Sequence, residues 1–169
     1  MRLGREHRGR GRGRRAPAEP RRAPPRRPSY FVYEGFDLRA ELERLCRLDA
    51  LGGPGGELAL APPELTVRRA AKRPRNRMGF AVIDQRRISV TAFPGVRHGD
   101  LAETLLHELV HVHVGVSPGS RRFHGREFKD GLEAAMREAY ELGPVRPRHS
   151  MHGIYAEAIE RRAARSAAA

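Results

Sequence analysis

The sequence lacks several residues that other protein classes depend on. Cys46 is the single cysteine among 169 residues, which excludes an internal disulfide framework and any zinc finger or ribbon built from cysteines. There is no tryptophan, so large core side chains are scarce. No apolar run reaches the roughly 18 residues of a membrane-spanning helix, and the Arg-rich beginning lacks the apolar stretch of a signal peptide. We therefore expect a soluble, cytoplasmic protein without membrane contact.

Lysine is nearly absent although the chain is strongly basic. Lys72 and Lys129 are its two lysines, so 31 of the 33 basic residues are arginines, as a GC-rich coding sequence would produce. Of the net charge of +13, residues 1–29 contribute +9, from 11 Arg and 2 Glu. Residues 30–169 hold 22 basic and 18 acidic residues, or +4. The basic excess therefore belongs mostly to the first 29 residues.

Composition divides the chain into three parts. Residues 1–29 are rich in Arg, Gly and Pro and have no hydrophobic periodicity, which predicts a disordered tail. Residues 30–145 contain the periodic apolar segments and are predicted to form one folded domain with a modest core. Residues 146–169 are rich in Ala and Arg and are predicted to be a C-terminal tail or a short helix.

The first half of the middle part predicts one helix and a small sheet. Apolar residues recur at helical spacing over 38–46, after Asp37, which is a good N-cap residue. Cys46 lies on this apolar face and is predicted to be a core residue, and the glycine-rich run 52–56 is predicted to end the helix. Three β-prone runs follow, and they predict a small antiparallel sheet: 65–69, 78–83 and 88–93.

Two helices are predicted after the sheet. The segment from Asp100 to Glu103 has the pattern of a capping box, and the helix that it opens runs to about Val114. After a loop at 115–123, a second helix covers about 124–142 and ends at a Gly-Pro sequence. The chain is therefore predicted to have an α+β fold, with the sheet packed on these two helices.

The run His107-Glu108-Leu109-Val110-His111 carries the chemistry. Four residues advance an α-helix by roughly 400°, so the two histidines lie one turn apart on one face, where both imidazoles can bind one tetrahedral Zn²⁺. Glu108 lies about 100° around the helix from His107, and from there it can act as general base on a water beside the metal. The alternative is a buried helix with two hydrogen-bonded histidines and a surface glutamate.

A zinc hydrolase needs a third protein ligand and an open position for water. The extended motif HExxHxxGxxH would place a histidine at position 117, which is Ser117, so that class of metalloprotease is excluded. His124 is the favoured third ligand, because it follows a loop that can fold back antiparallel and because Gly125 leaves room near a metal.

Three other residues are candidates for the third ligand. His113 is about 120° from His107 around the helix, so it is predicted to point away from the metal. Glu127 lies one turn after His124 and is the alternative ligand, or else it orients the site through a hydrogen bond or is merely exposed. Glu133 is the remaining candidate, further along the same helix.

Two segments together resemble the SprT-like zinc metalloproteases, the Spartan-related family. They are Thr-Leu-Leu-His-Glu-Leu-Val-His at 104–111 and His-Gly-Arg-Glu-Phe-Lys at 124–129, and the resemblance covers about residues 36–142. It implies a zincin-like α+β fold and proteolysis, in some members of proteins crosslinked to DNA. It also implies that Glu108 is the base and that three histidines hold zinc: His107, His111 and His124.

One feature departs from the fuller family pattern. Many members follow the protease domain with a Cys-based zinc ribbon, which a chain with one cysteine cannot form. This puts the DNA-related role in doubt and leaves the protease interpretation intact. A family of zinc ribonucleases also uses three histidines but has no glutamate after the first one, so Glu108 argues for a protease.

The resulting hypothesis is a zinc metallopeptidase that hydrolyses protein or peptide substrates, with DNA-associated proteins as one class. A bound peptide is expected to extend the sheet at the strand 88–93. No group that stabilises the oxyanion can be identified from the sequence. Four residues are candidates for this role: Tyr140, His149, His152 and Tyr155.

The alternative function is a nucleic-acid-binding module in which zinc is structural or incidental. DNA or RNA contact is expected through the Arg-rich tail and a basic cluster, since arginine binds phosphate readily. Few aromatic residues lie between these basic residues, so base stacking has little support. The basic cluster consists of Arg68, Arg69, Lys72, Arg73, Arg75 and Arg77.

Overall fold

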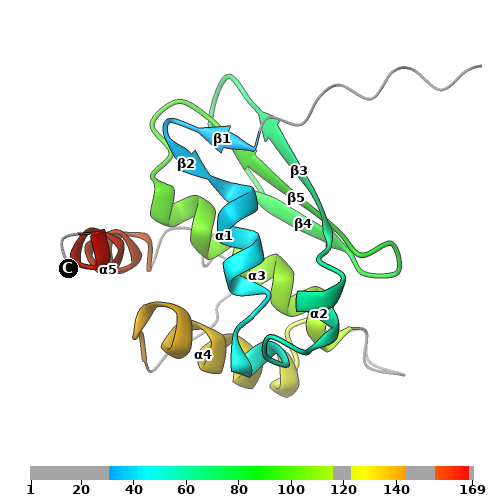
Figure 1. The fold of residues 1–169 in the computed structure, drawn as a ribbon. Helices are drawn as coiled ribbons and strands as arrows, with labels where there is room; N and C mark the ends of the chain where they lie inside the picture. Colours follow the sequence, from blue (N-terminus) through cyan, green and yellow to red (C-terminus); the bar gives the residue numbers. More distant parts are fainter. Residues whose placement is uncertain (1–30, 116–122, 144–154, 168–169) are drawn as a thin grey trace, which may run out of the picture.

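The computed structural model describes residues 31–115, 123–143 and 155–167 (Figure 1). The predicted tail at 1–29 lies outside the described residues. In chain order the elements are β1 (Val32–Tyr33), β2 (Phe36–Asp37), α1 (Leu38–Leu45), the 3-10 turn η1 (Asp49–Leu51), α2 (Glu57–Leu60), β3 (Glu64–Arg69), β4 (Gly79–Val82), β5 (Arg87–Ala92), α3 (His98–Val114), α4 (Arg126–Tyr140) and α5 (Ala156–Ala167). No helix within these ranges is long and apolar enough to cross a membrane.

Helix α1 begins as predicted. The carboxylate of Asp37 accepts hydrogen bonds from the backbone N–H groups of Arg39 (2.9 Å) and Ala40 (3.1 Å), and the side chain of Cys46 is buried in the core. The helix ends at Leu45, before the glycine-rich run that was predicted to end it. The chain instead turns into η1, whose first N–H groups are bound by the carboxylate of Glu138 from α4.

The three-stranded sheet is mixed, and the prediction of an antiparallel sheet is wrong for one of its two strand pairs. The strand order is β3-β5-β4, with β5 parallel to β3 and antiparallel to β4. The reason is the position of β5, which forms a hairpin with β4 and thereby inserts between the two preceding strands. Strand β4 consequently forms one edge of the sheet.

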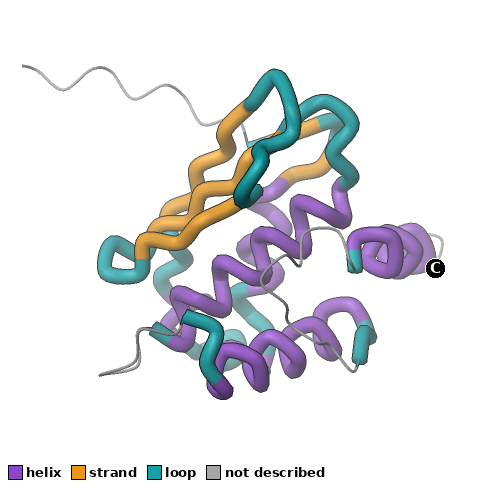
Figure 2. Tube along the Cα trace, turned by 180° about the vertical axis from the view of Figure 1, so that it is seen from behind, coloured by secondary structure: helices purple, strands orange, loops and turns teal. Residues whose placement is uncertain are grey.

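Helix α3 is the centre of the fold and packs against the sheet, α1, α4 and α5 (Figure 2). It begins at His98 with Arg97 as its N-cap residue, three residues before the predicted N-cap residue Asp100. Asp100 does not form the predicted capping box with Glu103. Its carboxylate accepts a hydrogen bond from the backbone N–H of Arg97 (3.2 Å), while Glu103 binds the backbone N–H of Tyr155 (3.0 Å).

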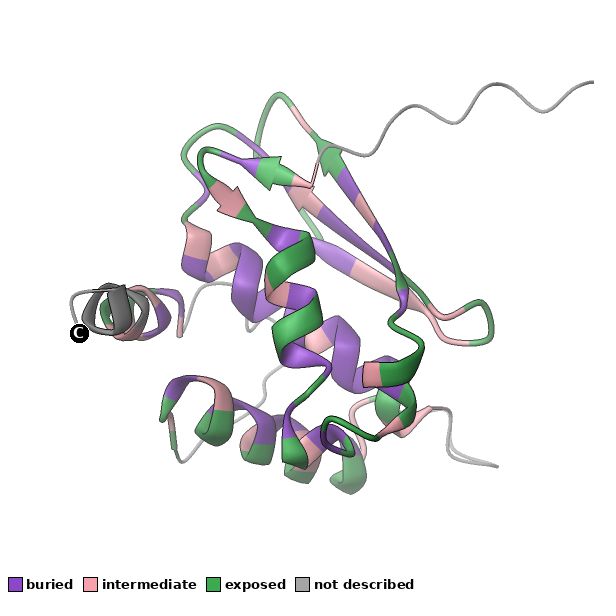
Figure 3. Cartoon of the chain, viewed as in Figure 1, coloured by how far each residue is buried: buried purple, intermediate pink, exposed green. Residues whose placement is uncertain are grey.

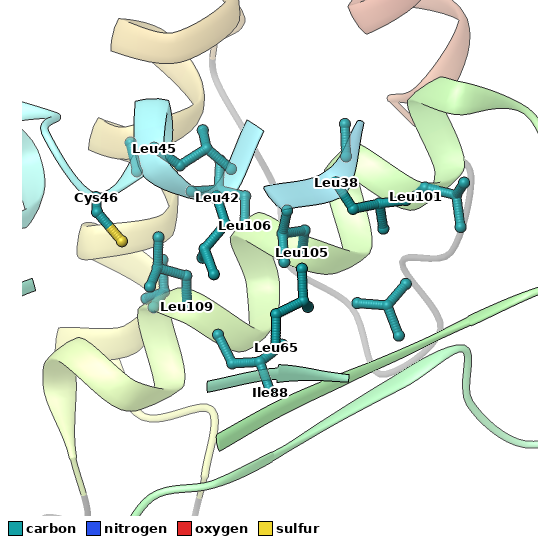
Figure 4. Close-up of a cluster of buried hydrophobic side chains, with 14 of the residues drawn as sticks. Leu38, Leu42, Leu45, Cys46, Leu65, Ile88, Leu101, Leu105, Leu106 and Leu109 are labelled. Carbon is teal, nitrogen blue, oxygen red and sulfur yellow. The ribbon is translucent and has the colours of Figure 1, made fainter. Parts of the chain in front are cut away.

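The core lies between α1, α3 and the inner face of the sheet (Figure 4). Twelve of the 17 residues of α3 are buried, so most of its circumference faces other elements (Figure 3). A helix this enclosed is held rigidly by its neighbours, which suits a site that requires fixed side chains. The buried leucines that α3 supplies to the core are Leu101, Leu105, Leu106 and Leu109.

Candidate metal centre

Three histidines from two helical regions converge on one point. His107 and His111 lie one turn apart on α3, and His124 lies just before α4, which folds back against α3. The Nε2 atom of His124 is 3.1 Å from that of His107 and 3.1 Å from that of His111. Within the described residues, these three are the one group of His, Cys, Asp or Glu side chains found close enough together to hold a metal ion.

The arrangement of the three imidazoles is better explained by a shared zinc ion than by hydrogen bonds between the rings. A ring nitrogen is either a donor or an acceptor, so the Nε2 atom of His124 cannot hydrogen-bond well to both neighbours at once. Two nitrogens about 2.05 Å from one tetrahedral zinc would be roughly 3.3 Å apart, close to the observed separations. Burial, with a smaller effect of His124, lowers the pKa of His111 to about 4, so this imidazole is neutral and can act as a ligand.

Phe128 packs against all three imidazole rings. It lies on α4 and is 1 % exposed, and its ring centroid is 4.2 Å from that of His111, 4.9 Å from that of His107 and 4.7 Å from that of His124. One side chain therefore contacts all three rings and limits their rotation. Phe128 was not among the predicted site residues, although its position one turn after His124 was a usable signal.

Glu108 lies beside the histidines and is nearly buried, with 6 % of its surface exposed. Burial raises the pKa of its carboxyl group to about 7, while the charge of Arg77 and a hydrogen bond from the backbone of Ala81 act in the opposite direction. A carboxyl group in this range can both accept and release a proton near neutral pH.

Gly79 of β4 provides the space that Glu108 occupies. A Cβ atom at position 79 would lie 2.6 Å from Cγ2 of Thr104, 3.0 Å from Cγ of Glu108 and 3.1 Å from its Oε1. Any other residue would force β4 away from α3 or displace the carboxylate. This role of Gly79 was not predicted, because the sequence does not indicate which strand approaches α3 most closely.

A cavity of about 300 Å³ is lined by the three histidines and Glu108. Its wall on the sheet side is the edge strand β4, so the prediction that a peptide pairs with the strand at 88–93 is wrong. That strand is β5, and both of its edges are occupied by β3 and β4. The lining residues are Asn76, Arg77, Gly79, Phe80, Ala81, Ile83, Glu103, Thr104, His107, Glu108, His111, Phe123 and His124.

The other candidate ligands lie elsewhere. His113 is exposed, as expected from its angular position on α3. Glu127 is exposed on α4, and Glu133 forms an ion pair with Arg137 at 2.8 Å. None of these three belongs to the cluster that could hold a metal ion in the described part of the chain.

Of the four candidate oxyanion donors, the two that the structure describes, Tyr140 and Tyr155, do not line the cavity. Tyr140 is buried on another side of the fold, where its hydroxyl donates a hydrogen bond to Glu41 at 2.6 Å. Tyr155 lies at the start of α5 and is also absent from the lining. His149 and His152 lie outside the described residues.

A comparison with known families finds one match for the chain. A family model described as the SprT-like family matches residues 56–149, which is more than half of the chain. The chain belongs to the SprT-like family. This is a family of zincin-like metalloproteases, so the resemblance and the α+β, zincin-like fold are confirmed. No curated protein and no solved structure matches the chain. The three histidines and Glu108 lie within the SprT-like match, whereas α5 lies beyond its end.

Proposed function

We propose that this SprT-like protein is a zinc-dependent metallopeptidase. The observation that carries the proposal is the convergence of three imidazole nitrogens beside a buried carboxyl group, at a cavity bordered by a sheet edge. His107, His111 and His124 would hold the zinc ion. When bound, zinc would supply a water of lowered pKa and polarise the scissile carbonyl group.

The protein's own residues would then position the substrate and move the proton. A peptide would lie in extended form along the free edge of β4, where backbone pairing permits loose sequence specificity. Glu108 would take a proton from the attacking water and pass it to the leaving amine. Because Gly79 has no side chain, β4 can lie close to α3, and a peptide paired with β4 would then lie beside Glu108.

The test compares the wild type with three variants, measuring bound zinc and cleavage of casein or of the protein itself. We expect Glu108→Gln to retain zinc and lose proteolysis, and His124→Ala to lose both. Glu127→Ala should retain zinc, because Glu127 is exposed and outside the histidine cluster. Retained proteolysis in Glu108→Gln would overturn the mechanism, and full zinc occupancy in His124→Ala would remove His124 as a ligand.

A second proposed function is DNA or RNA binding beside the cleft. The basic cluster, Arg68 to Arg77, occupies the end of β3 and the loop to β4, and its members Arg68 and Arg77 place their guanidinium groups over the ring of Phe80. Because Arg77 also lines the cavity, a nucleic acid bound here would hold associated proteins near the proposed active site. This arrangement supports DNA-associated proteins as substrates.

The test of this second function is DNA affinity at two salt concentrations, with and without residues 1–29. If phosphate contacts dominate, affinity should fall steeply as salt rises. Retained binding after removal of the tail would assign it to residues 30–169, which include the basic cluster. Absence of binding in both forms would leave only the peptidase.

A further inference from the structure

Hydrolysis of a peptide bond needs a group that stabilises the negative charge on the former carbonyl oxygen. Attack by water moves the π electron pair of the carbonyl group onto its oxygen. A protein hydrogen-bond donor aimed at this oxygen lowers the barrier, since its interaction is stronger in the transition state than with the neutral substrate. Among the described residues, Tyr140 and Tyr155 are absent from the lining of the cavity, whereas several other hydrogen-bond donors line it.

Arg77 is the one Arg or Lys among the described residues that line the cavity. It forms no ion pair with a carboxylate in the described ranges, so its guanidinium donors are available to a ligand. Both Arg77 and Glu108 line the cavity, and the positive charge of Arg77 partly offsets the rise that burial causes in the pKa of Glu108. Asn76 also lines the cavity but carries no charge.

Arg77 is exposed, and its neighbours limit where its side chain can lie. The next residue, Met78, is 2 % exposed and anchors the chain in the core, and Gly79 then begins β4 against α3. The guanidinium carbon of Arg77 lies 5.2 Å from the centroid of the Phe80 ring. Arg77 is therefore held at the start of the edge strand along which a peptide would lie.

We propose that Arg77 is a catalytic residue whose guanidinium group donates hydrogen bonds to the scissile carbonyl oxygen as that oxygen becomes negative. This inference rests on the proposed peptidase function. As the water oxygen bonds to the carbonyl carbon, one water proton passes to Glu108 and the π pair moves to the oxygen bound by Arg77. When the C–N bond breaks, its electron pair leaves with the nitrogen, Glu108 returns the proton to the amine, and the carbonyl group re-forms. The products are an amine and a carboxylic acid, which loses its remaining proton to solvent.

The experiment measures kcat, KM and bound zinc for Arg77→Gln and Arg77→Lys, using an uncharged peptide substrate. For Arg77→Gln we expect kcat to fall by about 10²- to 10³-fold, as for loss of an oxyanion donor, with KM changed less than about threefold and zinc unchanged. Arg77→Lys should retain part of the activity. The matched control is Arg126→Gln, which removes an exposed arginine two residues after His124 that does not line the cavity.

A second readout uses a phosphinic peptide, whose anionic tetrahedral phosphorus mimics the charged intermediate. Arg77→Gln should weaken inhibition by this compound by the same factor as it lowers kcat/KM. An unchanged kcat, a rise in KM alone, or an equal loss of activity in Arg126→Gln would each overturn the role of Arg77. Such results leave the peptidase function standing. Inactivity of the zinc-loaded wild type would instead remove the proposed function, and this inference with it.

Discussion

Two neighbours approach α3 unusually closely, and each approach depends on a glycine. On one side Gly79 of β4 faces the side chains of Thr104 and Glu108. On the other side Gly99 of α3 faces the backbone of Ala156 at the start of α5, where an added Cβ would lie 2.1 Å from the carbonyl oxygen. The approach at Gly79 places β4 against Glu108, the proposed base. The approach at Gly99 packs α5 against α3 about two turns before His107.

The two close approaches differ in which atoms a larger residue would displace. At Gly79 the obstructing atoms belong to side chains that form the proposed site, so a larger residue would disturb the site directly. At Gly99 the obstructing atoms are backbone atoms of α5, which is held there by hydrogen bonds from Tyr155 N–H to Glu103 and from Gly99 N–H to Glu160. Similar crowding should therefore affect activity in one place and stability in the other.

Of the two glycine substitutions, Gly79→Ala is expected to have the larger effect on activity. The new methyl group would push against Glu108 and Thr104, and a misplacement of about 1 Å in a catalytic group costs about 10²-fold in rate. We expect kcat/KM to fall by about this factor, measured with zinc-loaded protein and a peptide substrate. Gly55→Ala is the matched control, because a Cβ there has no atom within 4 Å and φ is not positive. Equal activity of Gly79→Ala and the wild type would show that the close approach is not needed for catalysis.

Zinc should stabilise the fold by a similar free energy in the wild type and in Gly79→Ala. The three histidines are intact in both, so zinc at about 100 times its Kd should add about 2.7 kcal/mol to the free energy of unfolding. Urea unfolding with zinc and with a chelator measures this difference. His124→Ala should lose most of it. A much smaller zinc effect in Gly79→Ala would mean that the substitution damages the metal centre and not only the base.

Gly99→Ala should mainly reduce stability. A Cβ so close to the Ala156 backbone requires α5 to move, and overpacking of this kind costs about 1 to 3 kcal/mol. Urea unfolding should show this loss, while the kcat/KM of the folded variant should fall far less than that of Gly79→Ala. An equal loss of activity in the two variants would show that the docking of α5 affects the proposed active site as much as the approach of β4 does.

Local spacing could be predicted from the sequence because it depends on few neighbouring residues. The helical period places His107 and His111 on one face of α3, and the carboxylate of Asp37 lies within reach of the first free N–H groups of α1. The convergence of His124 with the other two also requires that α4 pack against α3. The spacing of His107 and His111 and the capping by Asp37 depend little on the rest of the fold.

Features set by distant parts of the chain could not be predicted in this way. The parallel pairing of β3 with β5 depends on where β5 inserts, which the alternation of its side chains does not encode. Glu103 resembled half of a capping box, but its carboxylate binds a backbone group 52 residues later. A glycine at the start of a strand and an arginine in a basic run carry no local sign that the fold brings Gly79 and Arg77 to the proposed active site.

The smallest expected effect, that of His113→Ala, tests how sharply the site is confined to one face of α3. His113 is two residues from His111 but exposed, whereas His111 is 9 % exposed and faces the cavity. Substitution should change the free energy of unfolding by less than about 0.5 kcal/mol, as at other surface positions, and leave bound zinc unchanged. His111→Ala should abolish zinc binding. Both substitutions remove a histidine side chain from the same helix, so they differ only in the face of α3 that loses an imidazole. A loss of zinc in His113→Ala would mean that the metal lies on another face of α3 than the one formed by His107 and His111.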